Sequence, residues 1–256
     1  MNIILSKTPE ELGQKAAEQI ASLLREAIAR KGEARLALST GKSQFETLAA
    51  LVSEDVDWSR VTMFHLDEYI GLPETHPASF RKYLKERFTS KVQLKEAYFV
   101  DGEGDNGKNI LALNEAIRRA PVDVGVIGIG ENAHIAFNDP PADVDRDDAY
   151  FIVNLEARCR GQQVREGWFN TVDEVPKQAI TMSVQQIMRC EAVVSAVPHK
   201  EKAEAVQLTL TSPEITPLIP ATKLREHGNW TLYLDEGSAS RVCKLLSDTE
   251  RLTGSR

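Results

Sequence analysis

Cysteine is scarce in this sequence, and the three residues present, Cys159, Cys190 and Cys243, are widely spaced. An odd number of cysteines without a paired motif favours reduced thiols over disulfides or a zinc site. Apolar runs long enough to span a bilayer are also missing, and the first residues lack the basic and apolar pattern of a secretory signal. These absences predict a cytoplasmic protein with no membrane partner.

Positive charge is not in excess either, because the formal net charge is −7. A nucleic-acid partner is therefore not expected, since such proteins usually carry a basic surplus. An anionic metabolite remains compatible if a few cations form a local positive pocket. The hydrophobic fraction of 42% over 256 residues predicts one domain, residues 1–256, and leaves a homo-oligomer possible.

Strand patterns and helix patterns alternate along the chain. Apolar residues at three- and four-residue spacing predict a helix over residues 9–32. Short strands are expected at 2–5, 35–38, 61–66, 98–100, 123–129, 151–155, 192–197 and 230–234, and further helices at 45–51, 79–88, 110–117 and 200–210. A last helix is expected through Val242, Leu245 and Leu246. This order predicts an α/β fold: an open, doubly wound, mostly parallel sheet, Rossmann-like, with helices on both faces.

A glycine-punctuated stretch, residues 128–140, follows the apolar strand at 123–129 and presents His134 between short polar side chains. We expect it at the carboxyl edge of the sheet, where parallel folds bind ligands. Its Gly128, Gly130 and Ala133 also satisfy a loose dinucleotide fingerprint. The proline-rich residues 138–143 leave no room for the helix that a dinucleotide site requires, so none is expected.

Two other strand ends carry polar residues. Asp67 and Glu68 follow a predicted central strand, where carboxylates are costly to bury unless they are paired or used. A solvated acidic loop or a helix cap is the alternative there. The turn Thr40-Gly41-Lys42-Ser43 lies between a strand and a helix, a place that suits a phosphate group. A plain helix cap explains this turn equally well.

Three segments together resemble the glucosamine-6-phosphate deaminase (isomerase) family, whose superfamily also contains 6-phosphogluconolactonases. They are residues 64–72 with the following His76-Pro-Ala-Ser, residues 128–138, and residues 174–181. The continuation Ala136-Phe137-Asn138 after the motif histidine favours the deaminases. The lactonase branch typically has a threonine after this histidine.

The resemblance implies an aldose-to-ketose isomerisation with hydrolytic loss of ammonia, in which glucosamine 6-phosphate or a close relative gives fructose 6-phosphate. It implies no metal and no organic cofactor. Asp67 would move a proton from C2 to C1, and His134, assisted by Asn132 and Asp139, would open the sugar ring. The expected substrate-binding residues are Thr40, Gly41, Lys42, Ser43, Glu68, Gly130, Ala133, Arg165 and Lys202. Glu68 could equally be structural.

Near the histidine the sequence departs from the family pattern. The family commonly has Asp-Gly before the histidine and a glutamate five residues after it, whereas this chain has Asn132, Ala133 and Asp139. Asparagine can bind an imidazole but cannot supply a charge, and Asp139 is one methylene shorter than glutamate. Glu131 is an alternative source of charge.

The family's phosphate-binding arginine is also displaced, because Gly167 or a neighbour occupies its place in a straight count. Arg165, Arg160 and Arg158 are the candidate replacements. Two alternatives to a deaminase therefore stay open. One is a sugar-phosphate lactonase, and the other is a sugar-phosphate sensor without catalysis.

Overall fold

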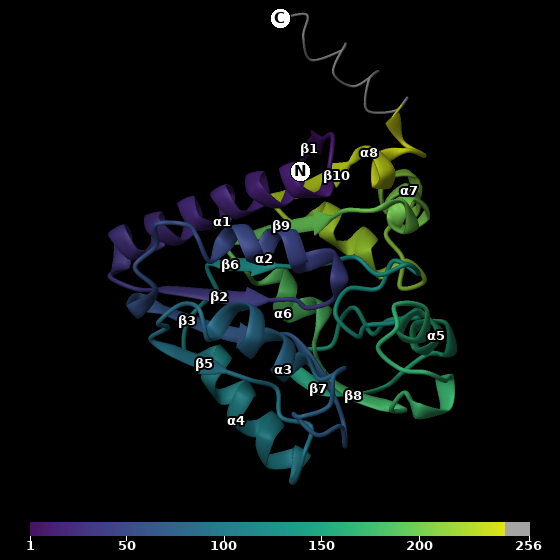
Figure 1. The fold of residues 1–256 in the computed structure, drawn as a ribbon, viewed down its shortest axis with the longest axis horizontal. Coiled ribbons are helices and arrows are strands. Elements are labelled where there is room, and N and C mark those ends of the chain that lie inside the picture. Colours follow the sequence, from purple (N-terminus) through teal and green to yellow (C-terminus); the bar gives the residue numbers. More distant parts are fainter. Residues whose placement is uncertain (244–256) are drawn as a thin grey trace, which may run out of the picture.

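The computed structural model describes residues 1–243. Its central sheet has seven strands, and each neighbouring pair is parallel (Figure 1). In spatial order they are β1 (Asn2–Ser6), β10 (Trp230–Asp235), β9 (Ala192–Val197), β6 (Val124–Val126), β2 (Ala34–Leu38), β3 (Val61–His65) and β5 (Glu96–Tyr98). The predicted fold class is confirmed.

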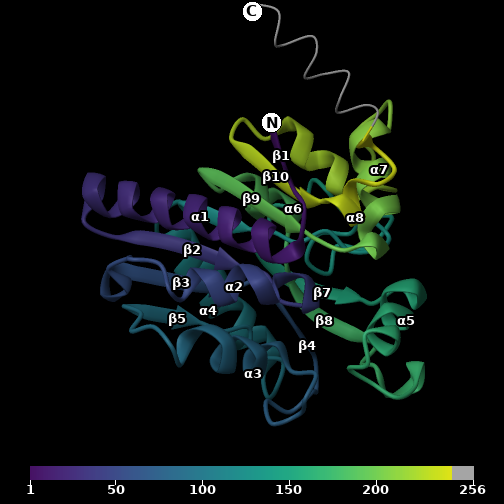
Figure 2. The same cartoon turned by 45° about the horizontal axis from the view of Figure 1, so that its top comes forward.

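Helices cover both faces of this sheet (Figures 1 and 2). One face packs against α1 (Pro9–Lys31), α2 (Phe45–Leu51) and α3 (Phe80–Leu84). The other face packs against α4 (Asn106–Arg118), α6 (Val184–Met188) and α7 (Ala203–Thr211). Because both faces are covered, β2 and β3 are buried along their whole length.

The long helix α1 has the end signals that its sequence predicts. The hydroxyl of Thr8 accepts a hydrogen bond from the backbone N–H of Glu11, and Gly32 ends the helix with a φ of 82°. A Cβ atom at Gly13 would lie 2.7 Å from the backbone of Glu46. The glycine therefore allows α1 and α2 to pack in direct contact across the face of the sheet.

A second, smaller sheet lies beyond the carboxyl ends of the central strands. It contains β4 (Asp67–Tyr69), β8 (Gln178–Met182) and β7 (Tyr150–Asn154), paired antiparallel in that order. The chain passes from one sheet to the other at Leu66, whose N–H bonds to Leu38 and whose carbonyl accepts from Met182. Glu68 is completely buried, so the alternative of a solvated acidic loop is wrong.

The end of one strand differs from the prediction, and two predictions reach beyond the described residues. Strand β6 ends at Val126 instead of Ile129, although the N–H of Ile127 still bonds to the carbonyl of Val194 on β9. The last described helix is α8 (Glu236–Ala239), and the predicted helix residues Leu245 and Leu246 lie outside the described part. The single domain over 1–256 stays a prediction for the same reason.

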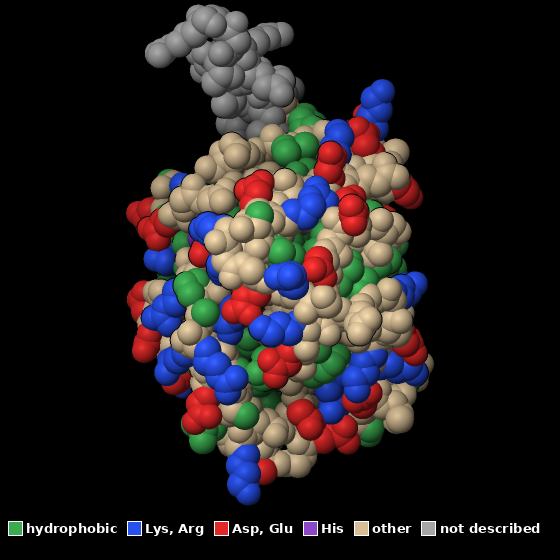
Figure 3. Space-filling model, turned by 90° about the vertical axis from the view of Figure 1, so that its left-hand side faces the viewer, with side chains coloured by type: hydrophobic (Ala, Val, Ile, Leu, Met, Phe, Trp, Pro, Cys, Tyr) green, Lys and Arg blue, Asp and Glu red, His purple; other side chains and the backbone are tan. Residues whose placement is uncertain are grey.

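Within residues 1–243, no helix combines the length and apolarity needed to cross a bilayer. Figure 3 shows one face of the molecule, on which lysine and arginine side chains alternate with acidic ones. This mixing agrees with the acidic overall balance and shows no basic surface on that face.

Candidate active site

The loop that follows β6 is folded tightly around His134. The N–H of Gly130 donates to the His134 carbonyl at 2.9 Å, and the N–H of Ala133 donates to the Gly130 carbonyl at 3.0 Å. A Cβ atom at Gly130 would lie 2.2 Å from the imidazole, so only glycine permits this packing. Ala133 has a φ of 62°, in the left-handed region that favours the glycine of the family pattern.

Two oxygen atoms approach the same nitrogen of His134. The Nδ1 atom lies 2.6 Å from Asn132 Oδ1 and 3.1 Å from Asp139 Oδ1. The amide Nδ2 of Asn132 donates to the same Asp139 oxygen at 3.2 Å, which identifies the other amide atom as an acceptor. Nδ1 therefore carries a proton, and Nε2 is the nitrogen able to accept one. Burial alone would raise the pKa of Asp139, but its bonds to His134 and Asn132 lower it overall.

The loop continues from the central sheet and is also tied to the small sheet. The side-chain amide of Asn138 donates to the carbonyls of Ile135 and Met182, both at 2.8 Å. The N–H of Phe137 donates to Thr181 Oγ1 at 3.0 Å. These bonds attach the segment after His134 to β8.

Asp67 is the first residue of β4 and lies beside β8, opposite Thr181. Its side chain lines the same pocket as His134, and the residue is 6% exposed. Burial raises the pKa of Asp67 to about 8, with smaller contributions from the charges of Glu68 and Asp139. A carboxyl group with this pKa exchanges protons near neutral pH, as a general base must.

Glu68 points away from the pocket and holds the following segment in place. Its carboxylate accepts hydrogen bonds from the hydroxyl of Ser79 at 2.8 Å and from the N–H groups of Tyr69, Phe80 and Arg81 at 3.0, 3.2 and 2.8 Å. Burial raises its pKa, and these hydrogen bonds act in the opposite direction. The structure therefore gives Glu68 the structural role, at the start of α3.

The turn after β2 closes the other end of the pocket. Gly41 has a φ of 102°, and its carbonyl accepts from the hydroxyl of Tyr83 at 2.9 Å. The buried side chain of Gln44 donates to the Ala196 carbonyl at 3.0 Å and holds the turn against β9. Within residues 1–243, the buried hydroxyl of Ser39 has no hydrogen-bond partner and lines the pocket. The turn is thus rigid and polar on its pocket side.

Lys202 ends a short 3-10 turn, Lys200–Lys202, directly before α7. The residue is 7% exposed and lines the pocket, and burial lowers its pKa. The ammonium of Lys42, from the turn after β2, lies 5.9 Å from the centre of the Trp168 ring. Lys42 and Lys202 therefore both line the pocket beside the 40–43 turn, where the sequence predicts a phosphate group.

Arg165, the arginine expected to bind substrate, does not line the pocket. Arg165, on α5 (Ala157–Arg165), forms an ion pair with the carboxylate of Glu131 at 2.5 Å. The charge of Glu131 is therefore directed to this arginine and not to the imidazole. Arg160 bonds to the Val172 carbonyl, and Arg158 lies 3.7 Å from a glutamate of α7. Among the described residues that line the pocket, lysine is the only positively charged type.

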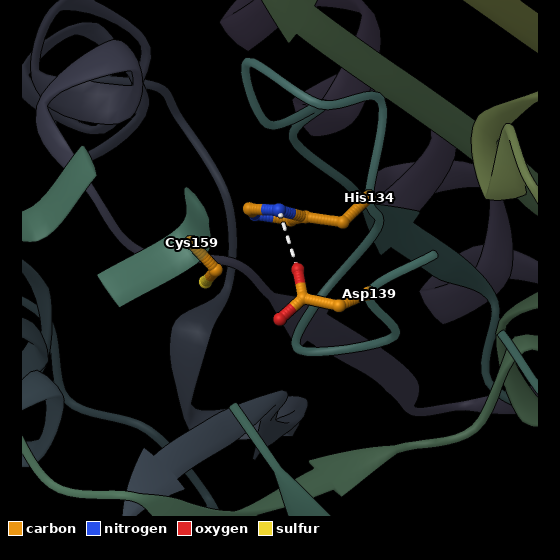
Figure 4. A group of neighbouring side chains, drawn as sticks. All are labelled: His134, Asp139 and Cys159. Atoms are coloured by element: carbon orange, nitrogen blue, oxygen red, sulfur yellow. Dashed lines mark ion pairs between the residues drawn. The ribbon is translucent and has the colours of Figure 1, made fainter. Parts of the chain in front are cut away.

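Cys159 lies next to the His134–Asp139 pair, as Figure 4 shows. Ligand atoms of the three residues lie within 4.8 Å of one another, and their types are those that zinc accepts. The imidazole and the carboxylate are already bonded to each other, however, and burial raises the thiol pKa well above its ordinary value. We therefore assign no metal to this cluster.

The pocket brings together eight of the predicted residues and is partly open to solvent. The eight are Thr40, Gly41, Lys42, Ser43, Asp67, Gly130, His134 and Lys202. Asn132 and Asp139 lie behind the imidazole, Ala133 and Glu68 are structural, and Arg165 faces away.

Sequence reasoning missed one wall of the pocket. Gln162 and Gln163 from α5, with Glu166 directly after it, line this wall. Phe80, Ala136 and Phe137 also contribute. The polar residues of α5 carry no pattern that shows which of them face the pocket, and the helix lies far along the chain from the turn that it faces.

Comparison with known proteins shows the family of the chain. Residues 7–233 match the family described as glucosamine-6-phosphate isomerases/6-phosphogluconolactonase. A glucosamine-6-phosphate deaminase from Lactobacillus delbrueckii subsp. bulgaricus is 34% identical over 247 residues, 94% of this chain and 99% of that protein. One from Streptococcus uberis is 35% identical over 245 residues, 94% of this chain and 100% of that protein.

Solved structures agree in fold as well. A monomeric glucosamine-6-phosphate deaminase has a TM-score of 0.85 at 29% identity, over 94% of this chain and 100% of that chain. A 6-phosphogluconolactonase from Thermotoga maritima has a TM-score of 0.75 at 17% identity, over 91% and 99% of the two chains. The family resemblance of the sequence is thus confirmed. The chain belongs to the glucosamine-6-phosphate isomerase/6-phosphogluconolactonase family.

Proposed function

We propose that this chain is an amino-sugar-phosphate deaminase, which converts glucosamine 6-phosphate and water to fructose 6-phosphate and ammonia. The observation that carries the proposal is the pairing, in one pocket, of a carboxyl group with a raised pKa and an imidazole with a free Nε2. The relatives named as deaminases support this reaction over lactone hydrolysis.

The imidazole suits the opening of the ring. Nε2 of His134 takes the proton of the hydroxyl group at C1 and returns a proton to the ring oxygen, while Asn132 and Asp139 hold Nδ1. The charge of Asp139 stabilises the imidazolium that forms between the two transfers. Asn132 fixes the orientation of the ring and adds no charge.

The carboxylate of Asp67 then takes the proton from C2 and delivers it to C1. The aldehyde oxygen gains a proton and the ammonium group of the substrate loses one, so the C1=O bond is replaced by a C1 hydroxyl and a C2=N bond. The raised pKa of Asp67 makes this carboxylate a stronger base than an ordinary aspartate. The positively charged amine of the substrate favours the ionised carboxylate once the sugar is bound. Water then adds at C2 and ammonia leaves.

The turn at residues 40–43 and the two lysines are the proposed site of the phosphate group. Polar backbone groups with one or two point charges bind an anion without a basic surface. Such a site agrees with the net charge of the chain.

The test is ammonium release by the purified chain, with glucosamine 6-phosphate and galactosamine 6-phosphate as substrates. Release from either supports the deaminase, and release from neither contradicts it. Acid production from 6-phosphogluconolactone would identify a lactonase instead. Binding without exchange of the C2 proton in heavy water would identify a sensor.

A further inference from the structure

A carboxylate lies where the pocket is otherwise cationic. Glu166 directly follows α5 and lines the same pocket as Lys42 and Lys202. The proposed anion site therefore contains one negative and two positive side chains. A site built only to attract a phosphate group would not include the carboxylate, because like charges repel.

Two donors hold this carboxylate in a fixed orientation. Gln162 Nε2 donates to one oxygen at 2.6 Å, and Trp168 Nε1 donates to the other at 3.0 Å. The amide of Gln162 is itself oriented, because its oxygen accepts the N–H of Glu131 at 3.3 Å. Each carboxylate oxygen keeps a further lone pair, so Glu166 can still accept hydrogen bonds from a ligand.

Both lysines are close to Glu166 or to its partner. The ammonium of Lys42 lies 5.9 Å from the ring centre of Trp168, the residue that donates to Glu166. Burial lowers the pKa of Lys202, and the charge of Glu166 acts against this effect. Glu166 thus reduces the attraction of this end of the pocket for a bare anion, while it offers acceptors to hydroxyl groups.

We propose that Glu166 is a specificity-determining residue, which accepts hydrogen bonds from sugar hydroxyl groups beside the two lysines and favours a hydroxyl-bearing phosphate ester over a bare anion. The inference rests on the proposed function for the class of substrate. It adds to that function the residue by which the pocket distinguishes a sugar phosphate from free phosphate.

The experiment compares binding of two ligands by calorimetry. Inorganic phosphate is the bare anion, and glucitol 6-phosphate is the polyol ester, which has neither amine nor carbonyl and cannot react. Both are titrated into the wild-type chain, Glu166→Gln and Glu204→Gln. The last variant removes the same charge from an exposed position on α7, two residues after Lys202, and does not touch the pocket.

We expect Glu166→Gln to bind inorganic phosphate more tightly and to lower the preference for glucitol 6-phosphate by about tenfold, because a repulsion and a charge-assisted acceptor are both lost. Glu204→Gln should leave the preference unchanged. An unchanged preference in Glu166→Gln overturns the proposal, whether both affinities rise, both fall or neither moves. If that variant does not fold, Trp168→Phe, which keeps the charge but removes one donor, should lower the same preference by a smaller factor.

The binding measurement does not depend on turnover, so the two proposals can fail separately. A chain that shows the expected change of preference but releases no ammonium contradicts only the deaminase reaction. A chain that releases ammonium while Glu166→Gln keeps the wild-type preference contradicts only the role of Glu166.

Discussion

The amide oxygen of Asn132 lies 2.6 Å from Nδ1 of His134, while the amide nitrogen of Asn132 donates to Asp139 at 3.2 Å. One neutral side chain thus bridges the imidazole and its carboxylate. A carboxylate in place of this amide would face Asp139 at hydrogen-bond distance. The asparagine therefore allows Asp139 to remain the one charged partner of the imidazole.

Asn132→Asp tests this relationship. Two carboxyl groups so close cannot both ionise freely, so the pKa of one of them should rise on folding. A folded-state pKa above the unfolded value gives stability that is present at low pH and lost as pH rises. Relative to wild type, the variant should lose roughly 1 kcal/mol more at pH 8 than at pH 5 in urea unfolding. The same change at the exposed Asn170 is the control, and a pH-independent difference would contradict the argument.

Asp67→Asn should abolish proton transfer without abolishing binding. The amide has nearly the same shape but cannot act as a base, so C2 exchange in heavy water should fall by about a thousandfold or more. Substrate affinity should stay within about tenfold, because the residue acts on the reacting carbon and not on the phosphate. Proton NMR and calorimetry measure the two quantities. A parallel loss of affinity would show that Asp67 mainly binds substrate.

The raised pKa of Asp67 also predicts the pH dependence of the reaction. Burial raises this pKa from 3.8 to about 8, so the basic form becomes populated as pH rises through that value. The kcat/KM for deamination should increase by about tenfold per pH unit below pH 8 and level off above it. A profile that is flat between pH 6 and 8 would contradict the assignment.

The raised pKa of Asp67 also predicts that its contribution to folding stability falls as pH rises, whereas activity increases. Because folding raises the pKa of Asp67, its contribution to stability is present below the unfolded value of 3.8 and is lost as pH rises toward about 8. Asp67→Asn removes this titration. The difference in unfolding free energy, variant minus wild type, should therefore increase with pH over this interval.

Glu68→Gln should destabilise the fold. The buried carboxylate accepts three backbone N–H groups and a hydroxyl, and the NH2 group of glutamine would face some of these donors. We expect a loss of about 2 kcal/mol in the free energy of unfolding. Glu86→Gln, at an exposed position of the same segment, should be neutral. Equal stabilities of the two variants would show that Glu68 is not needed to hold α3.

Gly130→Ala should damage the site while leaving the fold intact. The added Cβ would lie 2.2 Å from the His134 ring and must displace it. A shift of about 1 Å in a catalytic group costs on the order of a hundredfold in kcat. Gly107→Ala, where the nearest atom is a carboxylate oxygen at 3.4 Å, is the matched control. Unchanged turnover in Gly130→Ala would place the chemistry elsewhere.

Local patterns predicted the ends of α1, the 40–43 turn and the loop around His134, because caps, glycines and apolar spacing act over a few residues. The second sheet was not predicted, since Asp67 pairs with Thr181, far along the chain. The wall of the pocket formed by α5 was also not predicted. Neighbouring helical residues point about 100° apart, so a difference of one position separates Arg165, which faces Glu131, from Glu166, which faces the pocket.

The two sheets hold different ends of the pocket. Asp67 belongs to the small sheet, and the loop of His134 is bonded to it through Asn138, whereas the 40–43 turn follows a strand of the central sheet. The loop of His134 also continues directly from β6 of the central sheet, and Leu66 bonds to both sheets. Backbone hydrogen bonds therefore fix the base and the imidazole relative to the anion end, and the join between the sheets sets the length of ligand that the pocket can span.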